Sequence, residues 1–97
     1  MSDKVVPDQS VEAGYSQITS LSSAVGLGTI PTNAKRVFII PEGADVRWRD
    51  DGGVLSASIG MPLAVGQPLD YTGADLTKIK FIQQASGAKL NCVFYNQ

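Results

Sequence analysis

The sequence predicts an all-β fold: a small antiparallel β-sandwich or barrel, jelly-roll-like, with a flexible N-terminal arm. Three observations predict it. Runs of β-branched and aromatic residues recur at roughly eight to twelve residue spacing, turn residues separate them, and no stretch keeps a helical period beyond one turn. The chain has 97 residues, the length of one domain. We divide it into an arm, residues 1–14, and a single β domain, residues 15–97.

The first part of the chain has the weakest pattern. Residues 1–14 are polar and contain a Pro7-Asp8 turn signal, so we expect an arm that is disordered unless a partner orders it. Residues 16–22 are expected to form an edge strand with Ile18 turned inward. Serine-rich segments resist helix formation, and this one is permissive for β-structure.

The middle of the chain contains clearer strand signals. Residues 35–40 form a β-branched and aromatic run, which we expect to end in a turn at residues 41–43. Residues 45–49 alternate strictly between apolar and charged side chains, as a half-buried strand does. The run Asp50-Asp51-Gly52-Gly53 is a hairpin signal, and residues 54–60 are expected to form the next strand.

The last third is expected to contain a turn and three strands. The turn covers residues 65–68, and a short strand over 69–71 follows it. Residues 74–80 allow one helical turn at most. The two final strands, 78–83 and 88–95, are separated by Ala85-Ser86-Gly87, so we expect them to pair as an antiparallel hairpin. The last strand places four residues on one face: Ala88, Leu90, Cys92 and Phe94.

Composition excludes several classes of function. The formal charge is −1 with no block of like charges, so a nucleic-acid partner is not expected. Histidine is absent and the single cysteine, Cys92, has no base to activate it, so we expect no enzyme, metal or cofactor and no small-molecule substrate. No run is long enough to span a membrane, and residues 1–7 do not resemble a secretory signal.

The most informative side chains cluster at residues 47–51. Arg47-Trp48-Arg49 could stack on bases or sugars, but the alternation sends Trp48 to the core face with Val46. Arg47 and Arg49 are then interface candidates, with Asp45 or Asp50 as expected ion-pair partners. Asp50 and Asp51 are adjacent and lack the other ligands of a calcium loop, so we expect both to cap a turn. The candidate interface comprises Arg47, Arg49, Asp50 and Asp51.

The order of the elements is distinctive over about two-thirds of the chain, from Ala34 to the end. The segments that carry it are Val37-Phe38-Ile39-Ile40-Pro41-Glu42-Gly43, Val46-Arg47-Trp48-Arg49-Asp50-Asp51-Gly52, Gly60-Met61-Pro62-Leu63, Leu69-Asp70-Tyr71-Thr72-Gly73, Leu76-Thr77-Lys78-Ile79-Lys80-Phe81-Ile82 and Gly87-Ala88-Lys89-Leu90-Asn91-Cys92-Val93-Phe94-Tyr95.

With these segments in this order, the chain resembles a group of small structural proteins of tailed bacteriophages. The resemblance implies a non-enzymatic part of the virion, assembled in the host cytoplasm. A capsid decoration (cement) protein that binds the major capsid protein or other virion proteins is the leading expectation. A tail, tail-fibre or head-to-tail adaptor component is the alternative, and a small carbohydrate-binding module is a second. Independently, a domain this small without disulfides or metals usually needs assembly for stability, so a homo-oligomer is expected.

Overall fold

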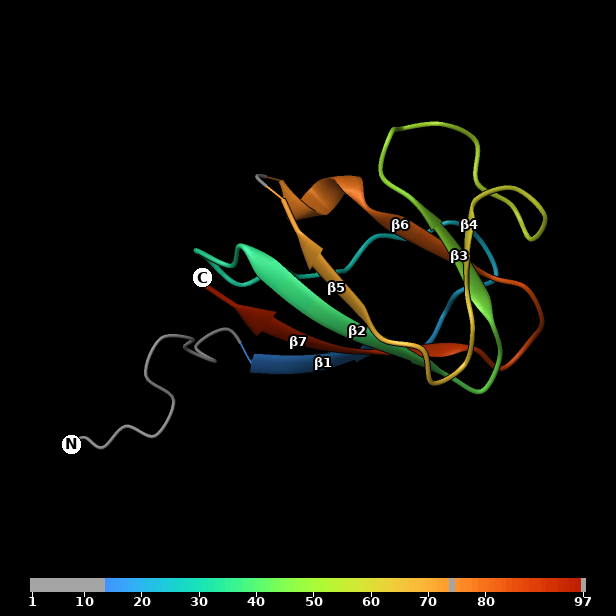
Figure 1. The fold of residues 1–97 in the computed structure, drawn as a ribbon, viewed down its shortest axis with the longest axis horizontal. Coiled ribbons are helices and arrows are strands. Elements are labelled where there is room, and N and C mark those ends of the chain that lie inside the picture. Colours follow the sequence, from blue (N-terminus) through green and yellow to red (C-terminus); the bar gives the residue numbers. More distant parts are fainter. Residues whose placement is uncertain (1–13, 74, 97) are drawn as a thin grey trace.

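The structure, a computed structural model, describes residues 14–73 and 75–96. The arm expected over residues 1–14 lies outside this part, apart from Gly14. The seven strands are β1 (Gly14–Ile18), β2 (Arg36–Glu42), β3 (Val46–Arg49), β4 (Met61–Leu63), β5 (Leu69–Thr72), β6 (Lys80–Gln83) and β7 (Lys89–Tyr95). They form two antiparallel sheets, β1-β7-β2-β5 and β4-β3-β6, which do not close into a barrel (Figure 1). The all-β sandwich prediction is confirmed.

The four-stranded sheet is organised around β2 and β7. These strands pair along their full length, from Arg36 opposite Tyr95 to Glu42 opposite Lys89. Their inward residues are almost completely buried, whereas the residues between them are partly or fully exposed, as the period of two requires. The predicted face of the last strand is therefore confirmed. The buried residues contributed by these two strands are Val37, Ile39, Pro41, Leu90, Cys92 and Phe94.

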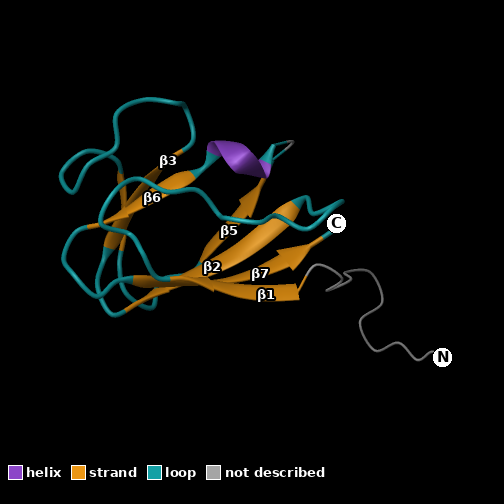
Figure 2. Cartoon of the chain, turned by 180° about the vertical axis from the view of Figure 1, so that it is seen from behind, coloured by secondary structure: helices purple, strands orange, loops and turns teal. Residues whose placement is uncertain are grey.

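One edge of the three-stranded sheet, strand β6, is covered by the irregular segment between β1 and β2. Val25 and Phe81 exchange two backbone hydrogen bonds, with N···O distances of 2.9 and 2.8 Å. The amide of Gln83 also donates to the carbonyl of Leu21 at 2.9 Å. In Figure 2 the loop between β1 and β2 passes beside β6. The stretch without a regular hydrophobic period therefore has a structural role: it covers the edge of β6 and adds Leu21 and Leu27 to the core.

Two strand predictions were wrong. Residues 54–60 form a loop instead of a strand, and its only β-bridge joins Ser56 and Ile59. The strand that pairs with β3 is β4, which follows this loop in the sequence. The expected hairpin of the last two strands is also absent, because β6 pairs with β3 while β7 pairs with β1 and β2. The turn at residues 84–88 carries the chain from one sheet to the other.

Two boundaries were also shifted. Pro41 and Glu42 belong to β2 rather than to a turn. Pro41 is tolerated because β5 pairs only as far as Ile39, so Pro41 lies beyond the end of that ladder. The edge strand expected over 16–22 is confirmed as β1, but it ends at Ile18. The predicted turn at 65–68 and strand at 69–71 are present, and a single 3-10 turn, Leu76–Lys78, occupies the allowed helical position.

The outer face of the four-stranded sheet has a feature that the sequence analysis did not identify. The register places Tyr15, Val93 and Phe38 side by side across β1, β7 and β2. Tyr15 is 62% exposed, and the other two are partly exposed. Hydrogen bonds organise this face: Tyr15 and Gln17 both donate to Asn91 Oδ1, at 2.7 and 3.0 Å.

Candidate functional site

The loop between β3 and β4, residues 50–60, is held by the two arginines of β3. Arg47 donates from Nε to the carbonyl of Ala57 at 3.0 Å and from Nη1 to that of Gly60 at 2.8 Å. Arg49 donates from Nη1 to the carbonyl of Val54 at 2.6 Å. A loop without regular strand pairing leaves carbonyl groups unpaired, and these guanidinium groups satisfy three of them. Both arginines therefore act first as braces of the loop.

Arg49 also forms a bidentate ion pair with Asp51. Arg49 Nε and Nη2 approach the two carboxylate oxygens of Asp51 at 2.8 and 2.6 Å. The hydrogen bonds from Arg49, followed by one from the Gly53 amide, lower the pKa of Asp51 to about 2. The pair also raises the pKa of Arg49. The expected partners were wrong, since Asp45 instead accepts a hydrogen bond from the Val65 amide at 2.8 Å.

The two adjacent aspartates have different roles. Asp51 Oδ1 accepts from the Gly53 amide at 3.1 Å, which confirms the predicted turn cap. Asp50 does not cap the turn, because its Oδ2 accepts the hydroxyl proton of Tyr71 at 2.8 Å. Burial, and then this hydrogen bond, raise the pKa of Tyr71 to about 12. The bond links the end of β3 in one sheet to β5 in the other.

Trp48 packs against the core on the predicted face of β3, but it is only partly buried rather than fully inside the core. Its ring packs against the core and meets Tyr71 edge-on, with ring centroids 6.2 Å apart and an angle of 65°. Across the strand pair its neighbour is Met61, which is 56% exposed because β4 is an edge strand. The short edge strand leaves one side of the indole uncovered, and the alternation of β3 could not reveal this.

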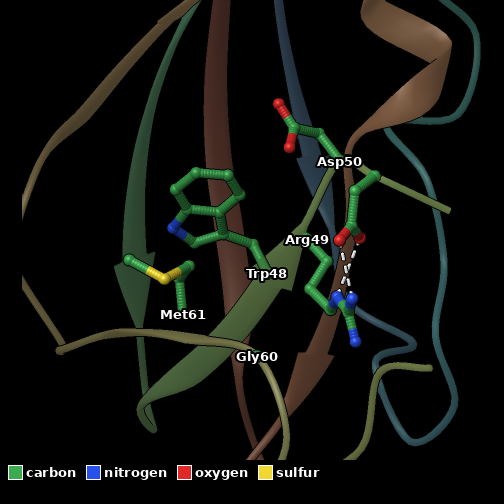
Figure 3. A pocket seen from close by; sticks show the side chains of 6 residues that line it. Trp48, Arg49, Asp50, Gly60 and Met61 are labelled. Carbon is green, nitrogen blue, oxygen red and sulfur yellow. Dashed lines mark hydrogen bonds and ion pairs between the residues drawn. The ribbon is translucent and has the colours of Figure 1, made fainter. Parts of the chain in front are cut away.

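These side chains line an open cleft of about 410 Å³. Its lining residues are Trp48, Arg49, Asp50, Asp51, Gly60 and Met61. Figure 3 shows the indole of Trp48 between the side chains of Met61 and Asp50, with the ion pair of Arg49 beside it. Three of the four predicted interface residues therefore meet in one cleft.

Arg47 is the predicted interface residue that the cleft does not include, because it braces the loop. Gly60 and Met61 were missed by the sequence analysis. Their proximity to Trp48 depends on the pairing of β3 with β4, which no local signal in residues 50–60 indicates. Gly60 has φ +139°, and an added Cβ would lie 2.5 Å from Leu55 Cδ1 and 3.1 Å from Arg47 Cβ. A glycine is therefore needed where the loop enters β4.

Exposed apolar side chains are frequent in the segment of the chain that contains β4. Of the five large hydrophobic residues that are well exposed in the described part of the chain, four fall between residues 54 and 65. They lie in the loop, at the start of β4 and in the turn after it. We call this set the β4 edge surface; it comprises Val54, Ile59, Met61 and Val65, with exposures of 68, 46, 56 and 49%.

Among the described residues no three His, Cys, Asp or Glu side chains come together as a metal site. Cys92 is buried as predicted, and burial raises the pKa of its thiol to about 12. No helix in the described ranges is long and apolar enough to cross a membrane. The cleft offers an aromatic face, a thioether and carboxylates, which suit contact with another molecule.

Comparisons with family models, with curated proteins and with solved structures gave no match for this chain.

Proposed function

We propose that this protein is a non-enzymatic structural component of a tailed bacteriophage virion. In this proposal it decorates the head shell as an oligomer and stabilises it by binding the major capsid protein. The resemblance of residues 34–97 to small virion proteins supports the proposal. The structural observation that carries it is the exposure of four large apolar side chains, the β4 edge surface, within residues 54–65. Exposed apolar side chains of this kind contribute to surfaces that bind other proteins.

The binding site proposed for the shell is the β4 edge surface together with the cleft beside it. Met61 belongs to both, and the arginine braces keep the loop in one conformation before binding. A loop that is already ordered loses little conformational entropy when a partner docks. Arg49 and Asp51 neutralise each other, so this part of the cleft rim carries paired charge.

Co-sedimentation with assembled shells tests this role. The wild-type chain should pellet with shells of the virus that encodes it, in amounts stoichiometric with the coat protein. The double variant Val54→Asp/Met61→Asp should lose this binding. The matched control Thr72→Asp/Ser86→Asp, which alters exposed positions elsewhere, should retain it. A wild-type chain that stays in the supernatant would overturn the proposal.

Copy number separates decoration from the tail or adaptor alternative. A decoration protein occupies the repeating shell lattice, whereas a tail or adaptor component is confined to one vertex or one appendage. Quantitative mass spectrometry of purified particles therefore distinguishes them. A copy number far below that of the coat protein would favour the tail or adaptor role.

A carbohydrate-binding module is the second candidate, and one observation favours it. Trp48 has an uncovered side next to the carboxylate of Asp50, a combination that suits stacking against a sugar ring and hydrogen bonding to its hydroxyl groups. Because Trp48 is the only tryptophan, its emission reports directly on this cleft. Oligosaccharides that shift the emission and protect it from iodide quenching would support this candidate over shell binding.

A further inference from the structure

The two sheets have four edge strands, and three of them are protected against pairing with another strand. β6 is covered by the backbone hydrogen bonds of Val25. β4 is three residues long with Pro62 at its centre, which has no amide proton to donate. β5 follows Pro68 and has a charged residue, Asp70, within its four residues. Natural sheets use coverage, proline and charge to prevent pairing between edges.

β1 lacks each of these protections. Its sequence, Gly-Tyr-Ser-Gln-Ile, contains neither a charge nor a proline, and β7 pairs with one side only. No described residue pairs with its other side. An edge strand of this kind presents a row of backbone donors and acceptors to an incoming strand.

Ser16, at the centre of β1, provides a second and independent observation. Its hydroxyl oxygen is buried and has no hydrogen-bond partner among the described residues. A buried hydroxyl group without a partner is destabilising, so such groups usually mark a missing contact. The described residues supply no partner for this hydroxyl group, and a strand that pairs with the free edge of β1 can supply one.

We propose that β1 pairs antiparallel with β1 of a second copy about a two-fold axis at Ser16. This register places Tyr15 opposite Gln17 of the second copy, and the two Ser16 residues opposite each other. Directly opposite residues have Cβ atoms about 4.5–5.5 Å apart, which lets the two hydroxyl groups hydrogen-bond to each other. No like charges meet, because β1 has none. The two four-stranded sheets join into one continuous sheet, and the exposed row from Tyr15 to Phe38 continues across the axis.

This inference deepens the proposed function, because it names the surface that forms the expected homo-oligomer. Its test needs no shells, so the two can fail separately. We expect analytical ultracentrifugation of the full chain to give twice the 10.2 kDa mass of one chain. The double variant Tyr15→Lys/Gln17→Lys should sediment at the mass of one chain, because the added lysines face each other across the axis. The control Thr72→Lys/Ser86→Lys adds the same charge elsewhere and should still dimerise.

Charge reversal keeps the test informative if a variant is poorly folded. Mixing Tyr15→Lys/Gln17→Lys with Tyr15→Glu/Gln17→Glu should restore a dimer that contains one copy of each, detected by native mass spectrometry. In addition, Ser16→Cys combined with Cys92→Ala should form a disulfide-linked dimer on oxidation, since opposite residues in this pair lie within disulfide range. A monomeric wild type, or lysine variants that dimerise as the wild type does, would show that β1 is not the interface.

Discussion

At the scale of single residues, the arrangement around residues 47–51 depends on which hydrogen bonds each charged group forms. Arg47 and Arg49 are two residues apart in β3, so alternation places both on the same face of the strand. They are also chemically alike, yet only Arg49 lines the cleft. Asp50 and Asp51 are adjacent, yet one binds a tyrosine of the other sheet and the other binds an arginine two residues away. Residue type predicted polar contacts in this region, but the identity of each partner follows from the position of the surrounding loop.

The ion pair of Arg49 and Asp51 predicts a measurable titration. Asp51 has its pKa lowered from 3.8 to about 2 in the folded state, so its contribution to stability is complete above pH 3.8 and lost as the pH falls towards 2. Replacing Arg49→Met should raise the pKa of Asp51 towards 3.8 and remove most of this pH dependence. Carboxyl-detected NMR titration measures it. Asp75, whose pKa is lowered by hydrogen bonds from Thr77, provides the internal control and should not change.

The hydrogen bond from Tyr71 to Asp50 predicts an energetic coupling between the two sheets. In a double-mutant cycle of Tyr71→Phe and Asp50→Ala, we expect a coupling free energy of about 0.5–1.5 kcal/mol in urea unfolding. The phenylalanine retains the edge contact with Trp48, so the cycle isolates the hydroxyl group. Additive effects of the two substitutions would mean that the bond contributes nothing to stability.

At the scale of elements, the sequence patterns identified strands better than they identified pairings. Alternation located β3, β5 and the buried face of β7 because burial on one side of a strand is a property of that strand alone. β6 pairs with β3 rather than with β7, and the paired residues are more than thirty positions apart in the sequence. The short turn at residues 84–88 has a composition that suits a hairpin and a crossing between sheets equally well. The segment at residues 19–30 was also missed, because its backbone contacts with β6 require no periodic pattern.

The crossing between sheets predicts an unusual sensitivity at Gly43. The turn between β2 and β3 lies against the turn between β6 and β7, so that a Cβ on Gly43 would collide with the carbonyl oxygen of Gly87. Gly43 also has φ +88°. We expect Gly43→Ala to lose about 1–2 kcal/mol for its backbone conformation and about 1–3 kcal/mol more for the collision.

Gly66 provides the matched control for this prediction. It has a similar φ of +80° but open space where a Cβ would be placed. Gly66→Ala should therefore lose only the conformational part, about 1–2 kcal/mol. Thermal or urea unfolding measures both. Equal losses at the two positions would contradict the packing of one turn against the other.

At the scale of the whole molecule, stability comes from one core between the two sheets. Both faces of the four-stranded sheet carry apolar residues, but the described residues cover only the inner face. A domain of this size buries a limited fraction of its surface. The partly exposed outer row, and the edge of β1 that no described residue pairs with, are therefore surfaces that assembly can use.

The sandwich predicts opposite outcomes for two neighbouring isoleucines in β2. Ile39 is completely buried in the core, whereas Ile40 lies on the outer face and is partly exposed. Ile39→Ala should lower the free energy of unfolding by about 2–5 kcal/mol, and Ile40→Ala by no more than about 1 kcal/mol. Urea unfolding of both variants at low protein concentration measures the difference. A larger loss at Ile40 would contradict the assigned inner face.

The sequence by itself determined the all-β class, most strand positions and the buried face of the last strand, because periodicity and turn chemistry act over a few neighbouring residues. Tertiary structure alone decided which strands share a sheet, that residues 54–60 form a braced loop, and that Trp48 borders a cleft. Within the described part of the chain it also left β1 as an edge strand without protection and the Ser16 hydroxyl without a hydrogen-bond partner. These properties depend on pairings between distant segments, whose free energy comes from burying one shared core rather than from any local preference.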